Sequence, residues 1–201
     1  MDFEKDPIPH LTGSLDARMY DFCVSKWKSS DNTNIENRYN VPITNALINS
    51  YLNVITNEAL SKLYPCLKNT YPNWSNDTFI KRYQFSGNLN IDRPYKMRDW
   101  HIDSGDKVMI GLWYFKHPND SSEGGLHISN GFSEVYLPYS ENFVVFLPNL
   151  PNAWHKVGDR NTWTHERRFI NIVVEQSELL HDYSREDDGS DRVKPVRNLM
   201  I

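Results

Sequence analysis

The sequence predicts an α+β fold, in which two N-terminal helical segments precede a run of short strands. Apolar residues recur at helical spacing in the first third of the chain, and segments of strand composition follow between residues 78 and 175. Turn-forming stretches such as HPNDSSEGG, SNG and PYSEN separate these segments at hairpin spacing. The strands are therefore expected to form a sandwich or barrel, with the helices packed on one sheet.

Two helices are predicted after an N-terminal arm of 14 polar, proline-containing residues. The first helix covers 15–28 with Ser14 as its N-cap, and the second covers 44–63. Pro65 is expected to end the second helix, because proline lacks the amide hydrogen and its ring clashes with the preceding turn. The periodic apolar residues are Leu15, Met19, Phe22 and Trp27 in the first helix and Leu47, Tyr51, Val54, Leu60 and Leu63 in the second.

Six strands are predicted from their content of β-branched and aromatic residues. They are Thr78–Phe85, Lys107–Phe115, Leu126–Ser129, Ser133–Leu137, Phe143–Leu147 and Arg167–Glu175. A length of 201 residues fits a single domain. We expect this domain to consist of an arm and helices in 1–72, a barrel core in 73–175 and a polar C-terminal tail in 176–201.

Charge and composition exclude several classes of protein. The net charge of −4 provides no global basic field, so neither a nucleic-acid partner nor an anionic membrane is expected. Two cysteines are too few for a disulfide framework or a cysteine metal site. No apolar leader and no membrane-spanning stretch is visible in the sequence, so a cytoplasmic location is expected. The sequence contains no feature from which an oligomeric state can be predicted.

A metal site is indicated by RDWHID at 98–103. In an extended strand, residues two apart point to the same face, so His101 and Asp103 can reach one point inside a barrel. His155, in NAWHKVGDR, is the next well-placed candidate. Two imidazoles and one carboxylate leave three positions of an octahedron open, as in the facial triad of non-haem Fe(II) oxygenases. The open positions would hold a co-substrate together with O₂.

The strand RRFINIVVE offers a cation that could bind the carboxylate of a co-substrate. Alternation puts Arg168 on a face that is otherwise aliphatic and should pack on the helices. It puts Arg167 on the face that carries Asn171, which suits a polar cavity. This favours Arg167, and Arg168 remains the alternative.

Four segments together resemble the iron(II)- and 2-oxoglutarate-dependent dioxygenases, in particular their small prolyl-hydroxylase-like branch. The segments are HID at 101–103, EGGL at 123–126, WHKV at 154–157 and RRFINI at 167–172. Their order is the order of the family, and the resemblance spans about residues 79–175. It implies a double-stranded β-helix, which is a jelly-roll or cupin-like barrel, with supporting N-terminal helices.

The resemblance also implies roles for individual residues. His101, Asp103 and His155 would ligate Fe(II), and Arg167 or Arg168 would bind the distal carboxylate of 2-oxoglutarate. Tyr83 would hydrogen-bond the same carboxylate. The family often has a serine or threonine two residues after the arginine, whereas this chain has Phe169 or Ile170 there.

The implied activity is a hydroxylase that uses Fe(II), 2-oxoglutarate and O₂ on a small-molecule or peptidyl substrate and releases succinate and CO₂. A cupin-like metal enzyme that does not use 2-oxoglutarate is the first alternative, although such barrels usually bring more histidines together than H-x-D does. A non-catalytic binding protein with the same barrel is the second. A degenerate member of that kind would be expected to have lost a ligand, and none is missing here.

Overall fold

The computed structural model describes residues 8–27, 38–72, 79–88, 100–120, 124–157, 167–176 and 180. The helices are α1 (Ala17–Lys26) and α2 (Ala46–Thr70). The strands are β1 (Leu11–Ser14), β2 (Arg38–Pro42), β3 (Ile80–Asn88), β4 (Lys107–Tyr114), β5 (Leu126–Ser129), β6 (Glu134–Leu137), β7 (Phe143–Pro148), β8 (Trp154–Val157) and β9 (Arg167–Glu175). The predicted tail, except for residues 176 and 180, lies outside the described residues.

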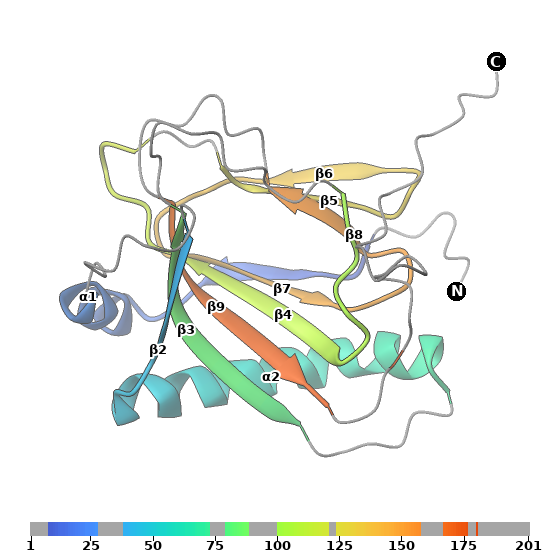
Figure 1. The fold of residues 1–201 in the computed structure, drawn as a ribbon, viewed down its shortest axis with the longest axis horizontal. Coiled ribbons are helices and arrows are strands. Elements are labelled where there is room, and N and C mark those ends of the chain that lie inside the picture. The colour runs from blue at the N-terminus through green and yellow to red at the C-terminus, as the bar shows by residue number, and fades with distance from the viewer. Residues whose placement is uncertain are drawn as a thin grey trace.

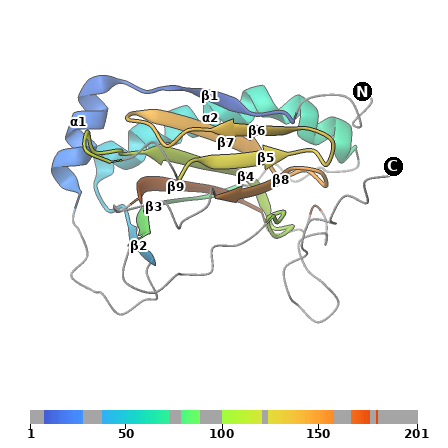
Figure 2. The ribbon, with the colours of Figure 1, turned by 90° about the horizontal axis from the view of Figure 1, so that it is seen from above.

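Two antiparallel sheets face each other, and the helices lie outside the larger one (Figures 1 and 2). The six strands of the large sheet have the order β1-β7-β4-β9-β3-β2, and the three of the small sheet have the order β6-β5-β8. Figure 1 shows the small sheet on one side of the large sheet and α2 on the other. This sandwich of antiparallel sheets with two helices confirms the predicted α+β class. Among the described residues, no helix has the length and apolarity needed to cross a lipid bilayer.

The two faces of the large sheet are distinguished by the alternation of side chains along β4 and β9. Trp113 of β4 lies opposite Ile170 of β9, and its ring contacts Tyr51 of α2 and Tyr20 of α1 at centroid distances of 6.1 Å and 6.2 Å. The even-numbered residues of β9, beginning with Arg168, therefore face the helices, as the alternation predicted. The odd-numbered residues, beginning with Arg167, face the small sheet.

The helices differ from the prediction at their ends. Ser14 is not the N-cap of α1, because its backbone is extended and pairs with Phe143 in the large sheet. Asp16 caps the helix instead, and its Oδ1 accepts a hydrogen bond from the Met19 amide at 3.0 Å.

Pro65 does not end α2, which continues to Thr70. The proline removes one backbone hydrogen bond, but Leu63 and Leu67 on either side of it are buried, and burial of each stabilises the helix by about 1.5–3 kcal/mol. The buried face of α2 also differs from the predicted one. Leu47 and Val54 are 56% and 63% exposed, whereas Ile48, Leu52, Ala59, Leu60, Leu63 and Leu67 are buried.

Three strands were not predicted, namely β1, β2 and β8. β1 lies in the predicted arm, and it pairs with β7 at one edge of the large sheet. β2 pairs with β3 at the other edge. β1 (LTGS) and β2 (RYNVP) contain glycine, asparagine or proline, which are depleted in strands, and β8 (WHKV) has two charged or polar residues at its centre, so composition did not identify them.

The double glycine before β5 permits a close approach between strands. The backbone of Gly124 has a φ of 90°, which residues other than glycine rarely adopt. A Cβ on Gly125 would overlap the Leu137 carbonyl oxygen, so any larger residue would push β6 away. The predicted role of this pair in a turn is thus refined to a turn followed by a tight contact.

Asn142 joins three parts of the chain at the start of β7. Its Oδ1 accepts from the Leu15 amide at 3.3 Å and from Trp113 Nε1 at 2.9 Å, and its Nδ2 donates to the Leu15 carbonyl at 2.8 Å. Its backbone has a φ of 50°, in the left-handed region that asparagine tolerates better than most residues.

We expect Asn142→Ala to lower the free energy of unfolding by about 2–4 kcal/mol, from the lost hydrogen bonds and the left-handed backbone. Asn142→Gly loses the same hydrogen bonds without the backbone strain, so it should cost about 1 kcal/mol less. Urea denaturation of both variants, with exposed Asn119→Ala as control, measures the difference. Equal stability of the alanine variant and the wild type would contradict this account of Asn142.

Candidate metal centre

His101 and His155 are placed side by side by a backbone bridge between distant parts of the chain. The amide of each residue donates to the carbonyl of the other, at 3.1 Å and 2.9 Å. Their ring centroids are 4.3 Å apart. Because β8 is itself paired with β5, this bridge attaches the segment around His101 to the edge of the small sheet.

The imidazole of His155 is oriented by its own chain. Its Nδ1 lies 3.2 Å from the Ala153 carbonyl oxygen, which can only accept, so Nδ1 carries the proton. Nε2 is then the nitrogen with a free lone pair, and it lies 3.5 Å from Asp103 Oδ2. A hydrogen bond that fixes the tautomer in this way is characteristic of histidines that bind metals.

Asp103 lies in a turn that a single buried asparagine holds in place. The side-chain amide of Asn149 donates to the carbonyl oxygens of Ser104 and Lys107, at 2.9 Å each, and to that of Asp103 at 3.4 Å. The turn also accepts two backbone hydrogen bonds from residues 176 and 180 beyond β9. The position of the carboxylate is therefore fixed by segments far apart in the sequence.

The Asp103 carboxylate is buried, with 6% of the residue exposed, and it is paired with a cation. Lys107 Nζ lies 2.5 Å from its Oδ1. Burial alone would raise the pKa of Asp103, but the charge and hydrogen bond of Lys107 and the nearby histidines together hold that pKa well below its ordinary value. The carboxylate is therefore charged at neutral pH, which is the state that binds a metal.

The three predicted ligands converge on one point. One ligand atom from each of His101, Asp103 and His155 lies within 4.8 Å of the other two. Two nitrogen donors and one oxygen donor suit a first-row transition metal such as Fe(II), and three ligands leave part of an octahedron open. The residues thus fit the ion that the sequence predicted.

Arg167 lies on the face of the large sheet that is turned toward the small sheet, and it is 2% exposed. Its Nη2 donates to the Tyr114 hydroxyl at 2.8 Å, and its guanidinium carbon lies 4.9 Å and 4.6 Å from the ring centroids of Tyr114 and Phe169. Its Nε has no hydrogen-bond partner, and no described carboxylate pairs with it. A buried cation without an anion is costly, so the site favours an anionic ligand.

Arg168 and Tyr83 lie on the opposite face of the large sheet. Arg168 Nη2 is 3.7 Å from Asp120 Oδ2, so this arginine already has a carboxylate partner. Tyr83 pairs with Ile172 across β3 and β9, and its hydroxyl lies beside Thr56 of α2. Burial raises the pKa of Tyr83 more than this neighbour lowers it.

The structure therefore places Tyr83 on the face of the large sheet opposite Arg167, and the predicted role for Tyr83 is corrected. Because Tyr83 lies opposite Ile172 of β9, its side chain points toward the helices and packs against the core. Arg168 is separated from the triad for the same reason.

Three residues of the site were missed in the sequence, namely Lys107, Asn149 and Tyr114. Lys107 follows Asp103 by four residues in DSGDK, which is a spacing that could have indicated an ion pair. Tyr114 shares its face with Arg167 through the pairing of β4 with β9, which becomes visible only when the register is known. No local signal identifies Asn149.

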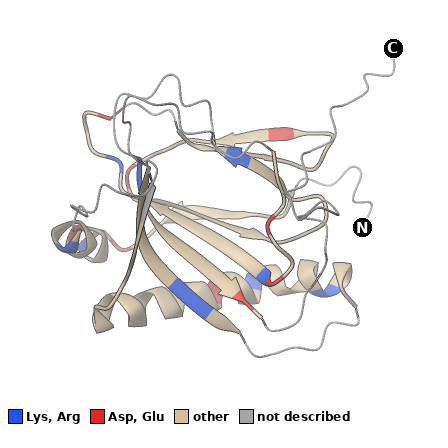
Figure 3. Ribbon diagram, viewed as in Figure 1, with Lys and Arg blue, Asp and Glu red and all other residues tan. Residues whose placement is uncertain are grey.

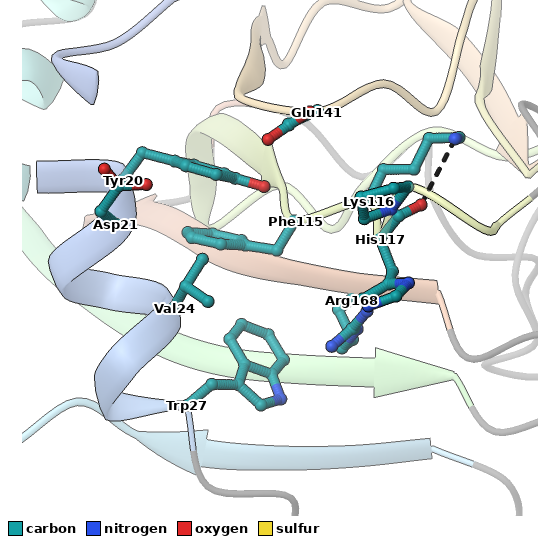
Figure 4. A pocket seen from close by; sticks show the side chains of 10 residues that line it. Tyr20, Asp21, Val24, Trp27, Phe115, Lys116, His117, Glu141 and Arg168 are labelled. Carbon is teal, nitrogen blue, oxygen red and sulfur yellow. Dashed lines mark hydrogen bonds between the residues drawn. The ribbon is translucent and has the colours of Figure 1, made fainter. Parts of the chain in front are cut away.

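A separate cavity of about 200 Å³ lies between α1 and the end of β4 (Figure 4). Tyr20 and Phe115 stack at its wall with centroids 5.0 Å apart, and Arg168 lines one side. None of the three candidate ligands lines it, and it lies on the helix side of the large sheet. It is therefore separate from the candidate metal centre.

Comparisons of the sequence with family models and with curated proteins give no match. The fold, in contrast, matches solved structures. The chain resembles the viral collagen prolyl hydroxylase of Paramecium Bursaria Chlorella virus-1, solved as a 2OG complex, with a TM-score of 0.55 and 11% identity over 84% of this chain and 96% of that one. It also resembles a 2OG-Fe(II) oxygenase family protein of Burkholderia pseudomallei, with a TM-score of 0.54 and 12% identity over 92% and 87% of the two chains.

A third similar structure is the prolyl hydroxylase of Trichoplax adhaerens in complex with a peptide fragment of the hypoxia inducible factor oxygen degradation domain. It has a TM-score of 0.52 and 10% identity, and the match covers 83% of both chains. The chain therefore has the fold of the prolyl-hydroxylase-like 2-oxoglutarate oxygenases, which the sequence motifs had indicated.

We expect His155→Ala to weaken the binding of Mn(II) or Fe(II) by more than about 100-fold, because loss of an outer-sphere partner of a ligand already costs 10–100-fold. His127→Ala is the matched control. His127 is on β5 next to Ile128, the residue opposite His155, so its side chain points to the other face of the small sheet. There its Nδ1 lies 2.7 Å from Glu134 Oε1. Anaerobic metal titration measures both variants. Unchanged affinity in His155→Ala would rule out the triad.

Proposed function

We propose that this protein is an Fe(II)- and 2-oxoglutarate-dependent oxygenase that hydroxylates a small-molecule or peptidyl substrate and releases succinate and CO₂. One observation carries the proposal. A His-Asp-His cluster and a buried arginine without an acidic partner among the described residues both occupy the space between the two sheets. A metal and a dicarboxylate together complete both sites.

We further propose that the sandwich is a double-stranded β-helix. From β3 to β9 the chain alternates between the sheets, if the bridged segment at His101 is counted as a short strand of the small sheet. The order is then large, small, large, small, small, large, small, large. Such crossing between two sheets is the arrangement of a jelly roll, and the structural neighbours support it.

His101, Asp103 and His155 would hold Fe(II). When bound, the iron supplies the activation of O₂, which protein side chains cannot perform. The residues of this chain supply position and shelter. The Ala153 carbonyl orients one imidazole, Asn149 fixes the turn of Asp103, and burial shields Asp103 and His155 from bulk water.

Arg167 would bind the distal carboxylate of 2-oxoglutarate. Tyr114 supports this assignment, because its hydroxyl already accepts from Arg167 and retains its own proton for an incoming carboxylate. Burial raises the pKa of Tyr114 although Arg167 opposes this, so the hydroxyl is protonated at neutral pH. The rings of Tyr114 and Phe169 both contact the guanidinium and restrict its orientation.

The alternatives account for less of the structure. A metal enzyme that does not use 2-oxoglutarate has no need of a buried arginine without a carboxylate partner. A non-catalytic barrel has no need of three converging ligands with an oriented imidazole. The peptide bound to the Trichoplax hydroxylase supports a peptidyl substrate as one of the two classes proposed. In Figure 3, basic and acidic residues both occur on the helices and on the strands of the described elements.

We expect the Fe(II)-loaded protein to form succinate from 2-oxoglutarate when it is exposed to O₂, and Asp103→Ala to lose this activity by more than about 100-fold because it removes a ligand. Asp106→Asn, in the same turn, is the control and should retain it. Succinate can be measured without knowledge of the substrate, through slow uncoupled turnover. Equal succinate from Asp103→Ala and wild type would contradict the proposal.

We expect Arg167→Met to raise the concentration of 2-oxoglutarate required for half-maximal turnover by about 100-fold, since charge-assisted hydrogen bonds contribute about 1.5–3 kcal/mol. Arg168→Met should change it less than about 3-fold, because that side chain faces the helices. Steady-state kinetics at varied 2-oxoglutarate would compare them. A larger effect in Arg168→Met would assign the carboxylate to the other face.

A further inference from the structure

The two oxygens of the Asp103 carboxylate have different neighbours. Oδ2 lies 3.5 Å from Nε2 of His155, which is another of the three candidate ligands. Oδ1 lies 2.5 Å from Lys107 Nζ. Lys107 and His155 therefore lie against different oxygens of the carboxylate.

Lys107 is held firmly in this position. Its amide donates to the Ser104 carbonyl at 3.0 Å, and its own carbonyl accepts from Asn149 Nδ2 at 2.9 Å. Lys107 is also the first residue of β4, and its backbone lies opposite that of Glu175 of β9 in the sheet. Its side chain is only 25% exposed, so the ion pair is largely shielded from water and is stronger than a surface pair.

We propose that Lys107 is a positioning residue that restricts Asp103 to coordination through one oxygen. This inference rests on the proposed function, because it concerns the metal of that same site. A carboxylate can bind a metal through one oxygen or through both. With its ammonium on Oδ1, Lys107 leaves Oδ2 as the oxygen available to the metal.

The restriction determines how many positions of the metal stay open. An octahedral metal that takes two imidazoles and one carboxylate oxygen has three open positions. A 2-oxoglutarate that chelates through two oxygens then leaves one position for O₂. If Asp103 bound through both oxygens, chelation by 2-oxoglutarate would leave none. Lys107 thus preserves the position that the reaction requires.

The test counts water ligands on bound Mn(II), which reports coordination without turnover. Wild-type protein loaded with Mn(II) in ¹⁷O-enriched water should show about three water ligands, and about one after 2-oxoglutarate is added. Lys107→Met should show about two, and none after addition. Electron-nuclear double resonance on Mn(II) measures these numbers.

Three further variants make the test specific. Lys107→Leu removes the ammonium in a second way and should behave like the methionine variant, so the outcome does not depend on one variant folding. Lys107→Arg keeps a cation in contact with Oδ1 and should retain the wild-type water count. Lys116→Met, two residues beyond the far end of β4, removes one positive charge without contact to Asp103 and should also match wild type.

The outcomes separate this inference from the proposed function. A wild-type water count in both Lys107→Met and Lys107→Leu, with Mn(II) bound, overturns the role of Lys107 and leaves the proposed function intact. Failure of the wild-type protein to bind Mn(II) overturns both. Loss of one water ligand in Lys107→Met and Lys107→Leu, but not in Lys107→Arg or Lys116→Met, establishes the positioning role of Lys107.

Discussion

The burial of charged groups between two sheets is the constraint on which the rest of this structure depends. Asp103 and Arg167 are almost fully buried, and a buried charge must be compensated. Asp103 is compensated by Lys107 within its own turn. Arg167 has a tyrosine hydroxyl and two aromatic rings but no described carboxylate. The site is therefore complete only with an anion beside Arg167 and a cation beside the triad, and this need links the geometry to the proposed chemistry.

The surrounding scaffold serves to fix these groups. The histidines are neighbours because two backbone hydrogen bonds join segments 54 residues apart in sequence. The turn of Asp103 is attached to the end of β7 by Asn149 and to the segment after β9 by backbone hydrogen bonds. Preorganisation of this kind reduces the cost of gathering ligands when a metal binds.

The sequence predicted those features that depend on local periodicity and on residue chemistry. The spacing of His101 and Asp103 predicted that their side chains converge, although the structure places Asp103 in a turn and not in a strand. Alternation along β9 separated Arg167 from Arg168. Features that depend on register or on long-range packing were not accessible. Tyr83 has the right residue type on the right strand, but its pairing with Ile172 turns it toward α2. The helix α2 runs through Pro65 because tertiary burial of Leu67 outweighs a local rule about proline.

The most direct test of the central claim is an anaerobic titration of the Fe(II)-loaded protein with 2-oxoglutarate, followed by visible absorption. A dicarboxylate that chelates the triad's iron while its distal carboxylate meets Arg167 should produce a saturable metal-to-ligand charge-transfer band. Tight binding of Fe(II) with no such band at any concentration of 2-oxoglutarate would contradict the account and favour a metal enzyme of another class.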